Sequence, residues 1–232
     1  MSVELTYLGH SAFQLTDGET TVLVDPFLTG NPAATTSADA LSADTILITH
    51  AHNDHVGDAP AIAKRTGATI ITVNELANYL SGKGLKNVIG GNHGGTISFT
   101  GGSVKFTQAW HSSVYNDDGK LVAPGVPAGL VVRYGGVTIY FAGDTALFSD
   151  MQLIGDEGLD AAVIPIGDHF TMGPADGVRA AKFLKAKTVI PCHYNTFPAI
   201  EQDAGAFKAS VERETSSTVV PLKPGESFTV GH

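Results

Sequence analysis

Four side chains that bind metal ions occur within the segment 48–58 (ITHAHNDHVGD). His50 and His52 are two positions apart, so in an extended chain both imidazoles point to the same side. Asp54 and His55 follow, where the chain is expected to turn. Such a cluster suits a cation, because zinc accepts histidine nitrogen and carboxylate oxygen and catalytic zinc keeps a position open for water. The weaker alternative is a solvated loop that happens to be rich in histidine.

Further metal-binding residue types stand alone, each directly after an apolar run. They are Asp25 in LVDPF, His111 in AWHSS, Asp144 in FAGDT and His193 in PCHYNTFP. Apolar runs of this length are typical of buried strands, so we expect each of these residues at the end of a strand. Residues at strand ends can converge although they are far apart in the sequence.

This order of motifs resembles the metallo-β-lactamase superfamily over nearly the whole chain. The segments GHSAF, AGDT, FTMGP at 170–174 and HYNTFP at 193–198 resemble one subgroup, the prokaryotic UPF0173 metal-dependent hydrolases. Relatives of that subgroup include the ascorbate-6-phosphate lactonase type. The resemblance implies the fold and a metal-dependent hydrolase, and it does not imply the hydrolysis of antibiotics.

The resemblance also implies how the ligands are divided between two divalent metal ions. One ion takes His50, His52 and His111, the other takes Asp54, His55 and His193, and Asp144 bridges them. Two ions about 3.5–4 Å apart can share a hydroxide and polarise the group under attack. Mixed histidine and carboxylate ligands favour zinc and also accept manganese, nickel or iron.

Asp54 is also the expected catalytic residue, since its carboxylate can orient the nucleophile and pass a proton to the leaving group. Asp25 is expected to support the histidine loop through hydrogen bonds, although a simple turn before Pro26 explains it nearly as well.

Candidate substrate contacts come from the remaining motifs. They are His10, His169, Phe170 and Met172. Tyr115 is a further candidate. It lies in the irregular stretch 112–128, which is expected to form a loop that covers the metals. His93 is expected in a surface turn, and His232 at the chain end carries no argument. Cys192 is expected to be a buried, unreactive thiol.

Strands and helices are expected where they would position these motifs. Strands are predicted at 3–8, 12–16, 20–25, 44–49, 69–73, 96–100, 103–109, 130–134, 137–141, 160–166 and 187–191. Helices are predicted at 58–65, 75–81 and 174–185. Asp58 is a predicted N-cap for the first helix and Gly67 its stop.

The second half of the chain repeats the plan of the first. The strand–turn–strand unit that closes on Asp25 reappears before Asp144, and each is followed by a more continuous apolar run. We therefore expect one domain over residues 1–232, with similar halves at about 1–115 and 125–232. The predicted class is α/β (α+β), a four-layer αββα sandwich with strand ends converging on one edge.

Composition narrows the partners and the compartment. The 232 residues carry 14 basic and 23 acidic side chains, a formal charge of −9, which argues against a nucleic-acid partner. The single cysteine fits a reducing compartment, and no apolar run reaches a membrane span, so a cytoplasmic protein with no membrane partner is expected. A homo-oligomer is compatible with the sequence, which does not determine the oligomeric state.

The predicted function is hydrolysis of a small ester, lactone or phosphodiester by a hydroxide that bridges two metals. Two alternatives stay open on the same fold. One is a metal-binding sensor without hydrolytic activity, which metal analysis would expose. The other is an oxygenase with one iron, which an oxygen-uptake assay would expose.

Overall fold

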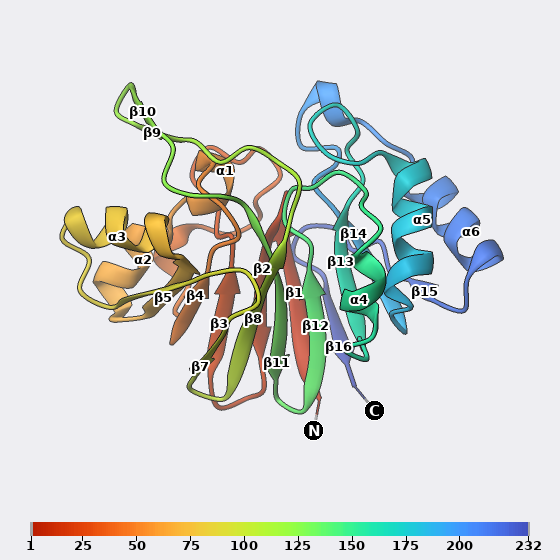
Figure 1. Ribbon diagram of the computed structural model, residues 1–232, viewed down its shortest axis with the longest axis horizontal. Helices are drawn as coiled ribbons and strands as arrows, with labels where there is room; N and C mark the ends of the chain where they lie inside the picture. The colour runs from red at the N-terminus through yellow and green to blue at the C-terminus, as the bar shows by residue number, and fades with distance from the viewer. Residues whose placement is uncertain (1, 232) are drawn as a thin grey trace.

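The computed structural model describes residues 2–231 as two seven-stranded sheets that face each other, with helices on both outer sides (Figure 1). The first sheet has the order β16-β1-β2-β3-β4-β5-β6. Its strands are β1 (Val3–Gly9), β2 (Ala12–Thr16), β3 (Thr21–Val24), β4 (Thr45–Leu47), β5 (Thr69–Val73), β6 (Val88–Gly91) and β16 (Ser227–Val230). The predicted four-layer architecture is confirmed.

The second sheet has the order β15-β14-β13-β12-β11-β8-β7. Its strands are β7 (Thr96–Phe99), β8 (Gly102–Gln108), β11 (Ala128–Tyr134), β12 (Val137–Phe141), β13 (Ala161–Pro165), β14 (Thr188–Cys192) and β15 (Thr218–Val219). A separate hairpin pairs β9 (Tyr115–Asp117) with β10 (Lys120–Val122). This hairpin lies in the stretch that the sequence suggested to be irregular.

Helices complete the outer layers on both sides. The helices are α1 (Asn53–Val56), α2 (Ala59–Thr66), α3 (Asn74–Gly82), α4 (Met151–Gly155), α5 (Pro174–Leu184) and α6 (Ala204–Glu214), with short 3-10 turns at Ala38–Ala40 and Pro198–Ile200. α2 and α3 cover the first sheet, and α4, α5 and α6 cover the second (Figure 1). No helix in residues 2–231 has both the length and the apolar character needed to cross a membrane.

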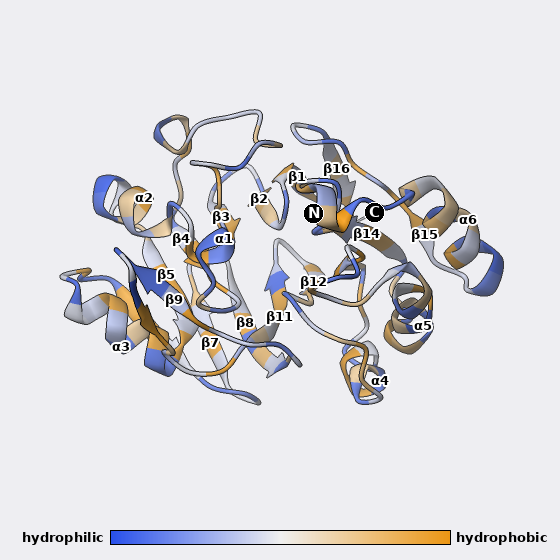
Figure 2. Cartoon of the chain, turned by 90° about the horizontal axis from the view of Figure 1, so that it is seen from above, coloured by the Kyte–Doolittle hydropathy of each residue, from blue (hydrophilic) through white to orange (hydrophobic). Residues whose placement is uncertain are grey.

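Both sheets have the same pattern of strand pairing. Counted from β16 in the first sheet and from β7 in the second, three antiparallel pairs are followed by three parallel pairs. Within the first sheet β1, β3 and β4 therefore run in one direction, and β8, β12, β13 and β14 do so within the second. The loops that follow these strands gather at one edge, seen from above in Figure 2 between the two helical layers.

The apolar core lies between the sheets and under the helices. Phe13, Phe106 and Leu130 are fully buried in the cluster that joins the two sheets. A second cluster, which includes Tyr140 and Phe207, packs α4, α5 and α6 against the second sheet. The core thus fixes both sheets and leaves their shared edge free for polar loops.

The predicted strands are all found, with small shifts at their ends, and the three predicted helices are confirmed. The elements that were not predicted from the sequence are β6, β9, β10, β15, β16, α1, α4 and α6. The strands divide between the sheets after Gly91, and β16 returns to the first sheet beside β1. That the two halves form a repeat stays a prediction, and His232 lies outside the described residues.

Asp58 stands at the N-cap position of α2, as predicted, but its side chain makes no capping hydrogen bond. Its carboxylate accepts hydrogen bonds from the backbone N–H groups of Leu28 at 2.9 Å and Thr29 at 2.8 Å. The carboxylate therefore joins the start of α2 to the loop that follows β3. Gly67 ends the helix in the left-handed conformation, as predicted.

Gly57 allows the histidine loop to pass close to that same loop. Its φ is +44°, and a Cβ atom there would lie 2.5 Å from the carbonyl oxygen of Pro26 and 2.6 Å from Cα of Phe27. Both neighbours are backbone atoms, which cannot move aside as a flexible side chain can. Only glycine therefore lets the two loops meet at this distance.

Gly57→Ala should destabilise the fold by roughly 2–6 kcal/mol, because it adds backbone strain to a backbone clash. Gly67→Ala is the matched control, since Gly67 also has a positive φ of +80° but has no atom within 4 Å of the added Cβ. That variant should cost about 1–2 kcal/mol. Urea unfolding measures both, and equal losses would contradict the role given to the close approach.

Candidate metal centre

The edge where the loops gather holds two adjacent groups of metal-binding side chains. The first group is His50, His52, His111 and Asp144, and the second is His10, Asp54, His55 and His193. Within each group, one nitrogen or oxygen per residue lies within 4.8 Å of the others. All seven residues predicted as ligands are therefore brought together, and His10 joins them.

The first group is built on the chain that leaves β4. Nε2 of His50 lies 3.0 Å from Nδ1 of His52, so both rings point to one place, as their spacing predicted. His111, which follows β8 in the other sheet, is mostly buried and its ring centroid lies 5.3 Å from that of His50. The group therefore spans the two sheets.

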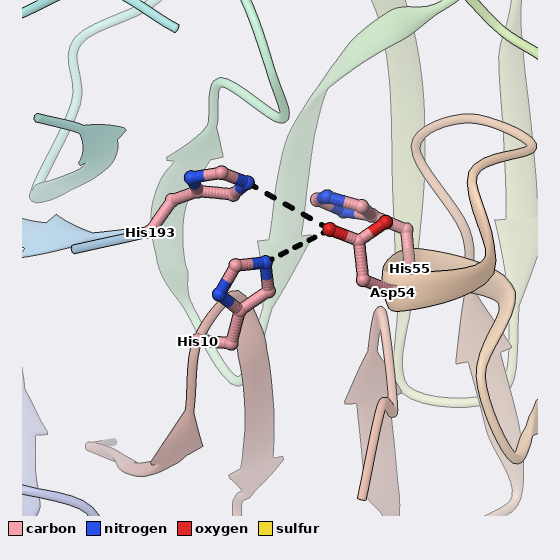
Figure 3. A group of neighbouring side chains, drawn as sticks. All are labelled: His10, Asp54, His55 and His193. Carbon is pink, nitrogen blue, oxygen red and sulfur yellow. Dashed lines mark hydrogen bonds and ion pairs between the residues drawn. The ribbon is translucent and has the colours of Figure 1, made fainter. Parts of the chain in front are cut away.

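The second group surrounds the carboxylate of Asp54 (Figure 3). Oδ2 of Asp54 lies 3.1 Å from Nε2 of His10 and 3.9 Å from Nε2 of His193. The two imidazoles come from different sheets, since His10 follows β1 and His193 follows β14. Asp54 and His55 come from α1, a single turn of helix in the loop that follows β4.

Asp144 lies between the two groups and is 3 % exposed. Its Oδ1 is 3.3 Å from Nε2 of His55, while its Oδ2 is 3.4 Å from Nε2 of His111 and 3.1 Å from Nε2 of His193. A carboxylate has two oxygens and can face two ions at once, whereas an imidazole offers one nitrogen at a time. The geometry fits the bridging position implied by the resemblance.

Two buried polar atoms between the groups are suited to coordinate cations. Nε2 of His55 and Oδ1 of Asp144 are buried and lie 3.3 Å from each other, but neither atom makes a hydrogen bond of acceptable geometry. Leaving such atoms unpaired costs about 1–3 kcal/mol each, and more when the group is charged. Coordination by a metal removes that cost, and the set of nitrogen and carboxylate donors is one that divalent transition ions accept.

Asp25 holds the ring of His55 in place. Its Oδ2 accepts a hydrogen bond from Nδ1 of His55 at 2.8 Å and another from the hydroxyl of Thr49 at 2.7 Å. Its Oδ1 accepts from the backbone N–H of Thr49 at 2.8 Å. With the proton of His55 on Nδ1, Nε2 is free to bind a metal, which is the usual way in which a carboxylate orients a histidine ligand.

Burial prepares most of these histidines to act as ligands. It is the largest cause of the lowered pKa of His50, His52 and His111, so their rings are neutral near pH 7 without metal. His10 follows the same trend, with its pKa lowered by burial to about 4. A neutral imidazole has a free nitrogen lone pair, so no proton has to be displaced before a metal binds.

His55 and the two carboxylates behave in the opposite way in the metal-free protein. Burial alone would lower the pKa of His55, but the carboxylates of Asp144 and Asp25 raise it well above its usual value. Burial alone would raise the pKa of Asp144 and Asp54. Neighbouring histidines, His193 and His55 beside Asp144 and His10 beside Asp54, instead hold both pKa values low. The site thus keeps its negative charge available for cations.

Three loop residues at the site have left-handed backbone. The φ values are +59° at His10, +45° at Asp25 and +53° at His193, a region in which side chains other than glycine are uncommon. A hydrogen bond of 2.8 Å from the N–H of His193 to the carbonyl of His10 joins two of these loops across the sheets. Such strain is typical of functional sites that the surrounding structure holds rigidly.

A cavity of about 280 Å³ opens above both groups. Seven of its lining residues were predicted as ligands or substrate contacts, among them His10 and Phe170, and the other two are Ser112 and Phe197. His52, Asp54, His111, Asp144 and His193 contribute the remaining polar wall. The candidate metal-binding atoms thus lie at the floor of a hollow that is large enough for a small substrate.

The predicted substrate contacts have different locations. His10 and Phe170 line the cavity, whereas His169 is exposed beside Phe170 and does not line it. Met172 is 3 % exposed and packs in the second core cluster, so it is not a substrate contact in this structure. The loop folds back there, because the N–H of Met172 bonds to the carbonyl of Thr145 at 3.0 Å.

Other predicted residues lie away from the cavity. The ring of Tyr115 packs against that of Tyr79 at 5.8 Å, and of the stretch 112–128 only Ser112 lines the cavity. His93 is exposed in its turn and contacts the carbonyl of Pro127. Cys192 is buried, and burial raises its pKa, as expected of an unreactive thiol.

Four residues at the site were not predicted from the sequence. Three are hydroxyl side chains that contact the histidines, and one is an aromatic side chain that lines the cavity. The hydroxyl of Thr196 lies 2.9 Å from Nδ1 of His10, and that of Thr49 lies 3.0 Å from Nδ1 of His50. Ser112 lies 3.3 Å from Nε2 of His52. Phe197 belongs to the quoted HYNTFP motif and directly follows Thr196, which was the available signal.

Comparison with known proteins now gives the family. A profile of the beta-lactamase superfamily domain matches residues 4–193. A UPF0173 metal-dependent hydrolase of Thermus thermophilus is 53 % identical over 224 residues, covering 97 % of each chain. The chain belongs to the UPF0173 metal-dependent hydrolases.

Two further proteins are similar to this chain over nearly their whole length. A UPF0173 metal-dependent hydrolase of Pelotomaculum thermopropionicum is 48 % identical and covers 97 % of this chain and 99 % of its own. The solved structure of a metallo hydrolase from the archaeon Ignicoccus hospitalis is 38 % identical, with a TM-score of 0.91 and full coverage of both chains. This UPF0173 protein is therefore a metal-dependent hydrolase of the beta-lactamase superfamily.

His111→Ala and His193→Ala should each lower the metal content to about one ion per chain or fewer, and each should reduce hydrolysis at least about 100-fold. Each change removes one nitrogen from a different group. Elemental analysis of protein purified without chelator measures the metal content. His93→Ala is the control and should leave metal content and turnover within about twofold. Full metal content and normal turnover in His111→Ala would remove that residue from the site.

Acidification should destabilise the metal-free protein between about pH 6.5 and 4. The unfolded chain takes up a proton on His10 near its ordinary pKa, while the folded chain takes it up only at about 4. His55 has a raised pKa, so its own stabilisation is fully present below pH 6.5 and does not offset this loss.

The free energy of unfolding should fall by roughly 2 kcal/mol or more between about pH 7 and pH 5. Urea titration of chelator-treated protein measures it. In His10→Gln the unfolding free energy should fall less steeply with pH. Some fall should remain, because His50 is also buried and also has a lowered pKa. An unfolding free energy that is independent of pH in this range would contradict the assignment of neutral buried imidazoles.

Proposed function

We propose that this protein hydrolyses a small ester, lactone or phosphodiester with the help of two divalent ions, zinc above all. His50, His52 and His111 would hold one ion, and Asp54, His55 and His193 the other, with Asp144 shared. The observation that carries this proposal is the position of Asp144, whose two buried oxygens face different histidines. A single ion would leave one of the two groups of donors unpaired.

Two such ions would supply a hydroxide at neutral pH and polarise the bond under attack. Asp54 then has a role of its own, because this residue lines the cavity and its Oδ2 is held by His10. It would accept a hydrogen bond from the attacking water and so orient the oxygen toward the carbonyl carbon. The new C–O bond forms, the ester C–O bond breaks, and the leaving oxygen receives a proton by way of this carboxylate.

Among substrates, we rank lactones and other esters above phosphodiesters, following the resemblance to the lactonase type. The partner is then a small molecule and not a nucleic acid, in line with the net charge of −9. The single buried thiol, Cys192, fits a reducing compartment, so we place the reaction in the cytoplasm.

The test is elemental analysis followed by product analysis. About two ions per chain are expected in protein purified without chelator, with turnover of lactones or esters that chelation abolishes and zinc restores. Fewer than about two ions with no gain on adding zinc, manganese or nickel would favour a sensor without hydrolytic activity. Oxygen uptake by the iron form, with no hydrolysis, would favour the oxygenase.

A further inference from the structure

Two phenylalanines form an apolar wall beside the candidate metal-binding atoms. Phe170 lies in the loop after β13 and is 56 % exposed, and Phe197 lies in the loop after β14 and is 36 % exposed. Both line the cavity, and the ring of Phe197 is 5.5 Å from that of His10. Large apolar side chains that stay exposed beside polar catalytic groups are typical of a binding surface.

No cationic side chain among the described residues lines this cavity. Of the residues 2–231 that line it, only Asp54 and Asp144 are formally charged, and only Ser112 carries a hydroxyl. The arginine and lysine side chains with ion pairs are engaged on other surfaces, such as Arg133 and Lys105 with Glu157. An anionic group on the far side of a substrate would therefore lose water without gaining a partner, which is costly.

The charge of two bound ions does not change this conclusion. Those ions would be held by side chains at the floor of the cavity, where Asp54 and Asp144 would offset part of their charge and where the reacting bond would lie. The part of the substrate away from the reacting bond would contact the aromatic wall of Phe170 and Phe197. The cavity volume of about 280 Å³ is near the lower end for ligand pockets, so the substrate is small.

We infer that the substrate is an uncharged ester or lactone whose part remote from the reacting bond is apolar and packs against Phe170 and Phe197. The site would correspondingly reject substrates that carry a phosphate away from that bond. The inference rests on the proposed function, since it concerns the substrate of the same site. The inference goes beyond the proposed function because it selects uncharged substrates with an apolar remote part.

Two matched pairs of lactones test this class on fully zinc-loaded protein. γ-Nonalactone, which adds a pentyl chain to γ-butyrolactone, should have a kcat/KM higher by about tenfold or more, because the added methylenes leave water. δ-Gluconolactone should be preferred over its 6-phosphate. A preference for the phosphorylated lactone, or equal rates for the first pair, would overturn the inference.

Variants locate the effect on the wall. Phe170→Ala and Phe197→Ala should each reduce the preference for γ-nonalactone severalfold, with unchanged metal content. Phe170→Lys should raise the relative rate with the phosphorylated lactone, because it supplies the missing cation. Leu153→Ala on α4 is the matched control, as this residue is exposed and lies outside the cavity, and it should keep the wild-type preference. Preferences that no Phe variant alters would overturn the assignment.

A binding measurement separates this inference from the proposed function. If zinc-loaded protein hydrolysed no lactone or ester, the proposed function would fail, and the wall would still be testable. Calorimetric titration with nonanoate and acetate compares two carboxylates that differ only in their apolar chain. At least about tenfold tighter binding of nonanoate, reduced in Phe197→Ala, supports the apolar wall. Equal affinities would overturn it.

Discussion

The burial of Asp144 between histidines is the interaction on which the site depends. A carboxylate that is 3 % exposed pays heavily for leaving water, and this cost is recovered only if opposite charge lies close to both oxygens. Without metal, the raised pKa of His55 shows one way of recovering it, since a protonated ring then lies 3.3 Å from Oδ1. A cation in place of that proton does the same with more charge. Folding and metal binding are therefore coupled at this residue.

The strain of the loops follows from the same requirement. His10, Asp25 and His193 adopt left-handed backbone because their side chains must turn inward from strand ends that belong to two different sheets. The sheets also supply equivalent positions. β1 and β8 each stand second in their sheets and are followed by His10 and His111, while β3 and β12 are followed by Asp25 and Asp144. One arrangement of strands thus presents a histidine and a carboxylate twice.

Sequence patterns predicted the local parts of this site well. The spacing of His50 and His52 sets the direction of their rings through the period of extended chain, and Asp144 and His193 were placed correctly because apolar runs precede them. Sequence patterns did not predict the contacts between segments that are far apart in the chain. Thr196 meets His10 across 186 positions, and the carboxylate of Asp58 bonds to amides about thirty residues away instead of capping its own helix. Met172 shares a motif with Phe170, yet the fold of their loop buries one and exposes the other. Period and propensity carry no information about such pairings.

The return of β16 to the first sheet has a practical consequence. Val3 pairs with Val230, so the two ends of the described chain lie side by side, at the end of the molecule away from the loops that follow β1 and β3 (Figure 1). A reporter fused to either end, or a surface attached there, would leave the mouth of the cavity open to solvent. Attachments at both ends would instead crowd each other.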